Sequence, residues 1–490
     1  MTPPRSRAEW AMRLRRDAVL AIDAEGAATL DSSRRVLRLG RLGSALAAAL
    51  NALSGKACTN SELTGIVAAE SGSAAMKLQL LLRKLSNGGW LEHTLTVDDV
   101  PLATLVPLGH AAVTVGPESL SNPLLAEPVR LSRFAVVRPV GGHLRIESGR
   151  SAAAVEILDA GCAPLLSLLA GGTTAVAAAD ALSGQTPDTI TALLAVVNAA
   201  GALAPGDPAL DPEDQEQRLA QWSTTDLLLH ASSRFGRRGD GYGGTYRFFE
   251  QFPPLPGQAA QSATPLQLIH LTQPDLAVVA GRDPRLTDVL EARRSLRKHD
   301  DTAPITAEQL GELLYRTVRI RRAVPAGGDE LVDRPFPAGG SLHELEVYPV
   351  VSTCAGLEPG VWHYDGLRHA FEKVQDPTPA MGELVAQARI TSLMDADPQV
   401  LLIIAARFGR VMWKYESMAY ALILKHVGVL YQTLYLTATA MRLAPCAQGG
   451  GSADLFAAAS GLDYYSEGSV GEFIVGSAAG DAASMWEAAP

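Results

Sequence analysis

Residues 413–451 constrain the fold most strongly, because they join a long apolar segment to a glycine-rich end. The segment contains one internal glycine, Gly428, and no proline before Pro445. Good helix formers dominate it, which predicts a helix over residues 417–442. Apolar side chains nearly encircle that helix: Ala419, Leu422, Ile423, Val427, Leu430, Leu434, Leu436 and Ala440. A helix that is apolar on all sides is buried, in a large core or between subunits, and we predict a buried core helix.

The composition limits the classes of function. A net charge of −10 argues against general nucleic-acid binding, which needs a cationic face. The cysteines lie far apart without histidine partners at ligand spacing: Cys58, Cys162, Cys354 and Cys446. This pattern argues against a structural zinc and fits a reducing cytosol. No window of about 18 uninterrupted apolar residues occurs, so we expect a cytoplasmic protein with no membrane span, no metal and no nucleic-acid partner.

The N-terminal part shows a weak internal repeat of helix triplets. The first triplet is expected at residues 42–53, from Asn60 or Ser61 onward, and at 74–85, followed by a strand at 90–97. The second triplet is expected at residues 163–170, 174–182 and 189–199. Three helices followed by a β-wing is the winged-helix pattern, and its recurrence predicts two such modules. The residues between them are rich in strand formers.

The chain changes character after the second triplet. Residues 205–222 are acidic and interrupted by prolines, which indicates a boundary. Residues 226–256 are rich in glycine, arginine and aromatic residues without clean periodicity, which predicts an extended arm that packs on another part of the protein. From about residue 264 the pattern mixes helices and strands. The expected helices are 286–294, 306–316 and 380–389, and the expected strands are 343–353, 360–365, 400–408 and 472–476.

Four polar or charged residues stand at the end of an expected helix: Arg293, Arg294, Ser295 and Arg297. Three guanidiniums and a hydroxyl so close together can form a fork for a phosphate group, since arginine donates in bidentate geometry. A solvated basic helix end that opposes the helix dipole is the alternative.

Two glycine loops could approach a planar or anionic ligand with their backbone amides. One contains Ala338, Gly339 and Gly340 and precedes a strand; the other contains Gln448, Gly449 and Gly450 and follows the long helix. An ordinary turn and a helix stop are the respective alternatives.

Lys414 and Tyr415 stand together at the start of the long apolar segment. Burial favours the neutral form of a lysine, which would suit a general base. The alternative is a snorkelling lysine beside a core tyrosine.

Taken in order, four motifs resemble the nitroreductase-like flavoproteins: RRSLR, PAGGSLHELEVY, GVWHYD and the long segment that ends in APCAQGGG. Within these they are similar to the SagB-type azoline dehydrogenases of thiazole and oxazole peptide biosynthesis. The segment HASSRFGRRGDGYGGTYRF is also similar to the one that precedes the flavin domain in that family. The resemblance covers about residues 222–480.

The resemblance implies an α+β fold: a nitroreductase-like FMN-binding domain, dimeric with FMN at the subunit interface, preceded by two winged-helix-like modules. The implied domains are 1–100 and 101–205 for the modules, 206–263 for a linker and arm, and 264–490 for the flavin domain. The modules would bind a leader peptide, serve as a docking scaffold or, as a third alternative, bind DNA.

Residue by residue, the resemblance assigns Arg293, Ser295 and Arg297 to the FMN phosphate, ribityl chain and pyrimidine edge. It assigns Ala338–Gly340 to the loop against the isoalloxazine, and Gln448–Gly450 to the loop whose amides lie near the cofactor. It assigns Lys414 and Tyr415 to the catalytic base region. The chain departs from the family at Ala338, where serine is frequent, and in lacking an arginine after Gly449.

The implied activity is FMN-dependent oxidation of thiazoline or oxazoline rings in a ribosomally made peptide. The implied partners are an azoline-containing precursor peptide and a cyclodehydratase. Two alternatives stay open: an NAD(P)H-dependent nitro- or quinone reductase, and a non-catalytic subunit that binds a leader peptide.

Overall fold

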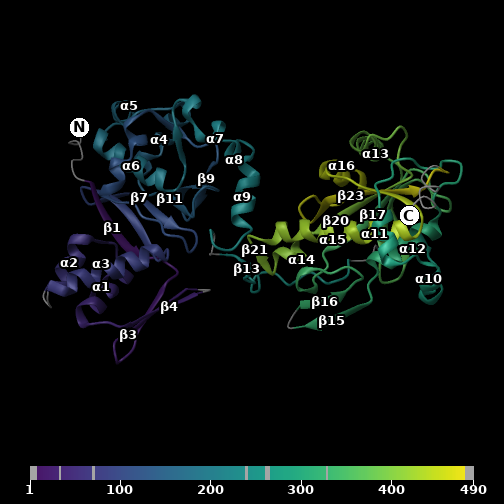
Figure 1. Cartoon of the computed structure of the whole chain (residues 1–490), viewed down its shortest axis with the longest axis horizontal. Coiled ribbons are helices and arrows are strands. Elements are labelled where there is room, and N and C mark those ends of the chain that lie inside the picture. Colours follow the sequence, from purple (N-terminus) through teal and green to yellow (C-terminus); the bar gives the residue numbers. More distant parts are fainter. Residues whose placement is uncertain are drawn as a thin grey trace. The chain divides into compact units, whose positions relative to one another are not determined.

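A computed structural model describes residues 8–32, 35–68, 72–237, 241–259, 265–326 and 329–480 (Figure 1). The chain divides into two compact units, residues 1–242 and 243–490. Among the described helices, none is both long and apolar enough to cross a membrane. All four cysteines are buried and form no disulfide bond, and the described residues contain no group of three metal-ligating side chains.

The first unit is built on one antiparallel sheet of seven strands. Its order is β5 (Cys58–Thr59), β1 (Ala8–Leu14), β6 (Leu91–Val97), β7 (Val100–Pro107), β11 (Ala153–Ile157), β10 (His143–Ser148) and β9 (Ala135–Val140). A smaller sheet contains β2 (Val19–Ile22), β3 (Ala27–Ser32) and β4 (Arg35–Arg41). The sequence analysis did not predict strands β1 to β4.

The two predicted helix triplets are present, and both pack against this one sheet. The first triplet is α1 (Ser44–Gly55), α2 (Asn60–Val67) and α3 (Gly72–Asn87). The second is α4 (Pro164–Gly171), α5 (Ala175–Ala181) and α6 (Pro187–Ala199). Each triplet has its own hydrophobic cluster, and the second cluster includes strand residues from β6 to β11. One continuous sheet therefore joins the two modules.

The prediction of an extended arm over residues 226–256 is wrong for its first part, because α9 spans Thr224–Ser232. Ser223 caps this helix by accepting a hydrogen bond from the Asp226 amide at 3.0 Å. Ser223 precedes residues 226–256, so the capping signal was not considered together with that segment and the helix was missed. The arm contains a two-residue strand, β13 (Gly243–Gly244), and residues 247–251 form hydrogen-bonded turns, so the prediction of an extended arm is wrong there too.

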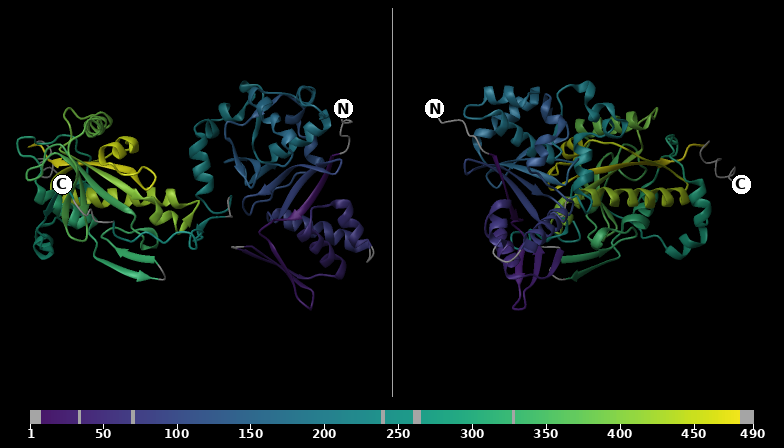
Figure 2. Two further views of the ribbon diagram at one scale, coloured as in Figure 1. Left: turned by 180° about the vertical axis from the view of Figure 1, so that it is seen from behind. Right: turned by 60° about the vertical axis from the view of Figure 1, so that its left-hand side comes forward.

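The second unit contains another seven-stranded antiparallel sheet (Figure 2). Its order is β14 (Gln267–His270), β19 (Ala370–Gln375), β18 (Gly360–Asp365), β17 (Leu345–Val351), β20 (Val400–Arg407), β23 (Glu467–Ser477) and β22 (Leu443–Ala447). Within β17 and β20, successive side chains point to opposite faces of the sheet. Both strands are fully buried, so each face must be covered by helices.

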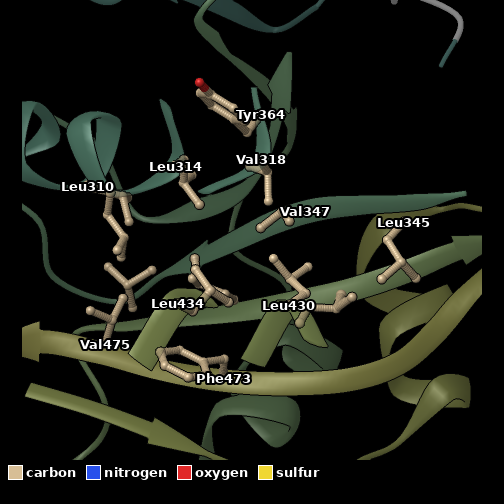
Figure 3. Packing of buried hydrophobic residues seen from close by; sticks show 14 of the residues in the cluster. Leu310, Leu314, Val318, Leu345, Val347, Tyr364, Leu430, Leu434, Phe473 and Val475 are labelled. Atoms are coloured by element: carbon tan, nitrogen blue, oxygen red, sulfur yellow. The ribbon is translucent and has the colours of Figure 1, made fainter. Parts of the chain in front are cut away.

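Helices α12 (Ala307–Val318) and α15 (Ala419–Ala440) cover one face (Figure 3). Side chains such as Leu314 and Leu430 meet Val347 and Phe473 of the sheet there. Helices α13 (Pro379–Ser392) and α16 (Ala453–Ser460) cover the other face, where Phe456 packs on Tyr348. The second unit therefore has three layers, with the sheet in the middle.

Shorter elements complete the second unit: α10 (Leu276–Arg282), α11 (Leu286–Ala292), the hairpin β15 (Arg322–Ala326) and β16 (Asp329–Asp333), α14 (Phe408–Met412) and β21 (Tyr415–Glu416). Strand β21 pairs with β13 of the arm.

The long helix α15 matches its predicted span, but the prediction that it is buried on all sides is wrong. Leu430 and Leu434 are fully buried, whereas Tyr420 and Leu424 are 41% and 40% exposed. A methyl group on Gly428 would touch nothing within 4 Å. The sheet reaches only part of the helix, so one apolar stripe of α15 stays uncovered in the single chain.

Candidate functional site

Lys414 and Tyr415 lie between α14 and α15, half-buried at the start of β21. The Lys414 Nζ lies 5.7 Å from the ring centre of Tyr415 and 5.7 Å from that of Tyr246. Such ring faces attract an ammonium group. Within the described part of the chain, no carboxylate pairs with Lys414. The amine is thus held by aromatic rings and not neutralised by an acid.

The glycine loop Ala338–Gly340 closes against this pair. Gly340 has a positive φ of 65°, which suits glycine. A methyl group at its Cβ position would lie 2.8 Å from the Tyr415 Oη and 3.3 Å from the Lys414 Nζ. The left-handed backbone and the close approach of the two side chains both favour glycine at this position. The structure therefore brings together two of the four predicted site segments.

A buried histidine holds the same loop from the other side. The Gly339 amide donates to His426 Nε2 at 2.7 Å, and His426 Nδ1 lies 2.7 Å from Glu344 Oε1. Because Nε2 accepts a hydrogen bond, the ring proton must reside on Nδ1, which then donates to the carboxylate. His426 is 4% exposed and Glu344 is 0% exposed. Sequence reasoning did not select either residue, although a histidine in an apolar helix is a usable signal.

The predicted phosphate fork follows α11 and packs on Tyr435. The Ser295 hydroxyl lies 2.7 Å from the Tyr435 hydroxyl, which also accepts a hydrogen bond from the Ala447 amide at 2.8 Å. The Arg293 guanidinium lies 5.3 Å from the centre of the Tyr435 ring. Among the described residues, no carboxylate pairs with Arg293, Arg294 or Arg297. These charges are free to meet an anion.

The second glycine loop borders a cavity of about 270 Å³. The cavity is lined by Tyr420, Tyr431, Gln448, Gly449, Gly450, Gly451, Ala453, Ser469, Val470, Gly471 and Glu472. No heavy atom lies within 4 Å of a methyl group built on Gly449 or Gly450, so their backbone is open to a ligand. Tyr431 lies one helical turn before Tyr435, which brings the cavity to the same side of α15 as the fork.

The predicted residues thus form two groups around α15. His426 and Tyr435 are nine residues apart in this helix, about two and a half turns, so they point to opposite sides. They are also separated by about 13 Å along the helix axis. Lys414, Tyr415 and Ala338–Gly340 form one group, and Arg293–Arg297 with Gln448–Gly450 form the other.

The second group suits a flavin mononucleotide. Unpaired guanidiniums fit a phosphate, and open glycine amides fit a polar ring edge. Glu472 is the one acid at the cavity, and burial raises the pKa of its carboxyl, which favours the neutral form. Ala338 offers no hydroxyl, but the backbone of its loop remains available. The donor set therefore fits the cofactor.

Comparison with protein families matches three segments of the chain. Residues 8–114 match the ThcOx helix turn helix domain, residues 129–239 match the cyanobactin oxidase ThcOx, and residues 290–477 match the nitroreductase family. Residues 290–477 thus form a nitroreductase-family segment, and two ThcOx-type segments precede it. The predicted fold class and the predicted family resemblance are confirmed, and the chain belongs among oxidoreductases. Residues 240–289 match none of the three.

The chain is also similar to individual known proteins. A protein of Methanocaldococcus jannaschii, named provisionally as a nitroreductase, is 29% identical over 165 residues, which are 34% of this chain and 78% of that protein. A nitroreductase-like structure from Ralstonia eutropha has 21% identity and a TM-score of 0.35, and the match covers 46% of this chain and 98% of the other. The Escherichia coli microcin synthetase McbBCD, solved with a truncated pro-MccB17, has 20% identity and a TM-score of 0.32, with coverages of 49% and 89%.

Proposed function

We propose that this protein oxidises thiazoline or oxazoline rings of a ribosomally made peptide to thiazole or oxazole, with FMN as cofactor. The observation that carries this proposal is the closure of the Ala338–Gly340 loop against Lys414 and Tyr415. An amine and a phenol at a flavin-type loop supply a base. Reduction of a nitro group or a quinone would not need a base of this kind.

Oxidation of an azoline ring requires a proton acceptor at a fixed position. A thiazoline becomes aromatic when it loses the proton on the carbon next to the carbonyl and a hydride from the neighbouring ring carbon. Bound FMN supplies the hydride acceptor. Lys414 Nζ or Tyr415 Oη takes the proton, and the Gly340 backbone fixes the space in which the ring lies. The rings of Tyr246 and Tyr415 lie beside the amine, each with its centre 5.7 Å from Nζ.

The cofactor would be held by the second group. Arg293, Ser295 and Arg297 would bind the phosphate and ribityl chain, with Arg297 toward the pyrimidine edge. The amides of Gln448–Gly450 would face the ring system. Ala338–Gly340 would cover the ring system of the flavin. This loop lies on the other side of α15 from the phosphate group.

We further propose that the protein is a homodimer. The base group and the phosphate group lie on opposite sides of α15, so one chain cannot easily present both to one flavin. The uncovered stripe with Tyr420, Leu424 and Gly428 lies on the side of α15 that carries Tyr431 and Tyr435, and it would face a second copy. The two groups that surround one flavin would then come from different copies. A precursor peptide and a cyclodehydratase are the proposed partners.

The test starts with the visible spectrum of the purified protein and of its heat-released supernatant. We expect flavin bands that elute as FMN. A thiazoline peptide is then expected to lose the mass of H₂ on turnover. Lys414→Ala and Tyr415→Phe should keep FMN and lose at least 100-fold in rate, the scale of general base catalysis.

Other outcomes identify the alternatives. Steady turnover of NAD(P)H with a nitroarene, with no action on the peptide, would favour a nitro- or quinone reductase. A colourless protein that cannot be loaded with FMN but binds a precursor peptide would favour a non-catalytic subunit. Equal activity in the two variants would overturn the assignment of the base.

A further inference from the structure

The arm, defined here as residues 243–252, is attached along the base segment. Gly243 pairs with Glu416 and Gly244 with Tyr415 in an antiparallel ladder. The Tyr246 amide donates to the Lys414 carbonyl oxygen at 3.2 Å. These contacts follow one another without a gap, so the backbone of the arm fixes the register of residues 414–416.

Side chains reinforce the same register. The Tyr246 ring lies edge-on to Trp413 at 5.7 Å between centres, and the Trp413 indole N–H donates to the Phe252 carbonyl oxygen at 2.7 Å. Arg247 forms an ion pair with Glu416 at 3.2 Å. Tyr246 itself has a positive φ of 53°, uncommon for a tyrosine, which these contacts sustain.

Tyr246 is placed to act on the base. Its ring centre lies 5.7 Å from the Lys414 Nζ, so the ring face confines the amine. Its side chain is nevertheless 42% exposed, and Phe249 next to it is 64% exposed. Tyr246 thus contacts Lys414 and Trp413 and still remains partly exposed.

We propose that the arm forms one wall of the substrate site and that Tyr246 is the positioning residue of Lys414. This rests on the proposed function and adds a residue from a segment that no family match covers. The open part of the ring would bind the planar azoline of the peptide by stacking, while the part against Lys414 holds the amine toward the proton that is removed.

The test uses the full-length protein with its bound flavin and a thiazoline peptide. Tyr246→Phe keeps the ring and should lose much less activity than Tyr246→Leu, because the Tyr246 hydroxyl forms no hydrogen bond within the described chain. Tyr246→Leu removes the ring and should lower kcat about tenfold and raise KM. Tyr465→Leu, at an 83% exposed tyrosine of the same unit, is the matched control and should change neither.

A double variant separates positioning from general damage. If Tyr246 acts through Lys414, Tyr246→Leu should not lower kcat further in a Lys414→Ala protein. Bound FMN and the melting temperature are measured for each variant. Independent losses that multiply in the double variant, or equal kcat in the Leu and Phe variants, would overturn the inference. A wild-type protein that does not oxidise the peptide would instead count against the proposed function.

Discussion

The contact between His426 and the Gly339 amide is the residue-scale feature on which the site depends most. The loop from Ala338 to Glu344 carries three residues with positive φ: Gly340, Ser341 and His343. Such a loop needs external contacts to keep its shape. His426 supplies one, with its ring fixed by Glu344, so the imidazole acts as a rigid link between α15 and the loop.

Two substitutions at His426 should therefore differ. Glutamine can place an acceptor near the position of Nε2 and keep the bond from the Gly339 amide. Asparagine reaches only the position of Nδ1 and leaves that partly buried amide unpaired, which costs about 1 kcal/mol. We expect His426→Asn to lose roughly tenfold in azoline oxidation and His426→Gln to lose much less. Rates are compared at equal flavin content, and identical rates would contradict the link.

At the scale of elements, the segment that carries the phosphate fork is locked to the sheet by His299. Its Nδ1 accepts a hydrogen bond from the Gln399 amide at 3.2 Å, and its ring packs against Gly476 of β23. Burial lowers the pKa of His299 to about 4, although Asp301 opposes this effect. The imidazole is therefore neutral in the folded protein, as its acceptor role requires.

This pKa shift predicts acid sensitivity. The folded pKa lies below the usual value of about 6.5, so the stabilisation is complete above pH 6.5 and is lost as the pH falls toward 4. At pH 5 the loss from this group is about 2 kcal/mol. We expect the melting temperature to drop between pH 7.5 and 5, and His299→Asn, which keeps an acceptor near Nδ1, to reduce that drop. His270→Asn, at an exposed histidine, is the control and should leave the drop unchanged.

Sequence periodicity predicted the elements that bury a regular face. The span of α15, both helix triplets and β17, β18 and β20 follow their patterns closely. The pattern could not show that one side of α15 stays uncovered, because an apolar stripe has the same sequence whether a sheet or another subunit covers it. Strands β1 to β4 were missed, although burial alternates along β2, β3 and β4.

The site was predictable segment by segment but not as an arrangement. Glycine loops and the Lys414–Tyr415 pair are visible in the sequence, and the closure of Gly340 on that pair is a tertiary contact. His426 and Tyr246 act through partners about 90 and 170 positions away, so no local pattern points to them. The arm was expected to pack on another part of the protein, and in the structure it pairs with β21.

At the scale of the whole molecule, the separation of the two groups on α15 determines how subunits would cooperate. In the proposed homodimer, a flavin held by the fork of one copy meets the base and the loop of the other. A copy with Arg293→Ala and Arg297→Ala lacks a fork but keeps a base, and a Lys414→Ala copy has the opposite defect. Each variant alone should be nearly inactive.

Mixed dimers of these two copies should regain activity, because one of their two sites combines an intact fork with an intact base. Random exchange makes about half of the dimers mixed, so the mixture should reach about one quarter of the wild-type rate. Lys414→Ala mixed with Tyr415→Phe is the control, since every site then lacks one member of the base pair. If fork and base of the same chain served one flavin, both mixtures would stay inactive, because each copy would carry its own defect into its own site.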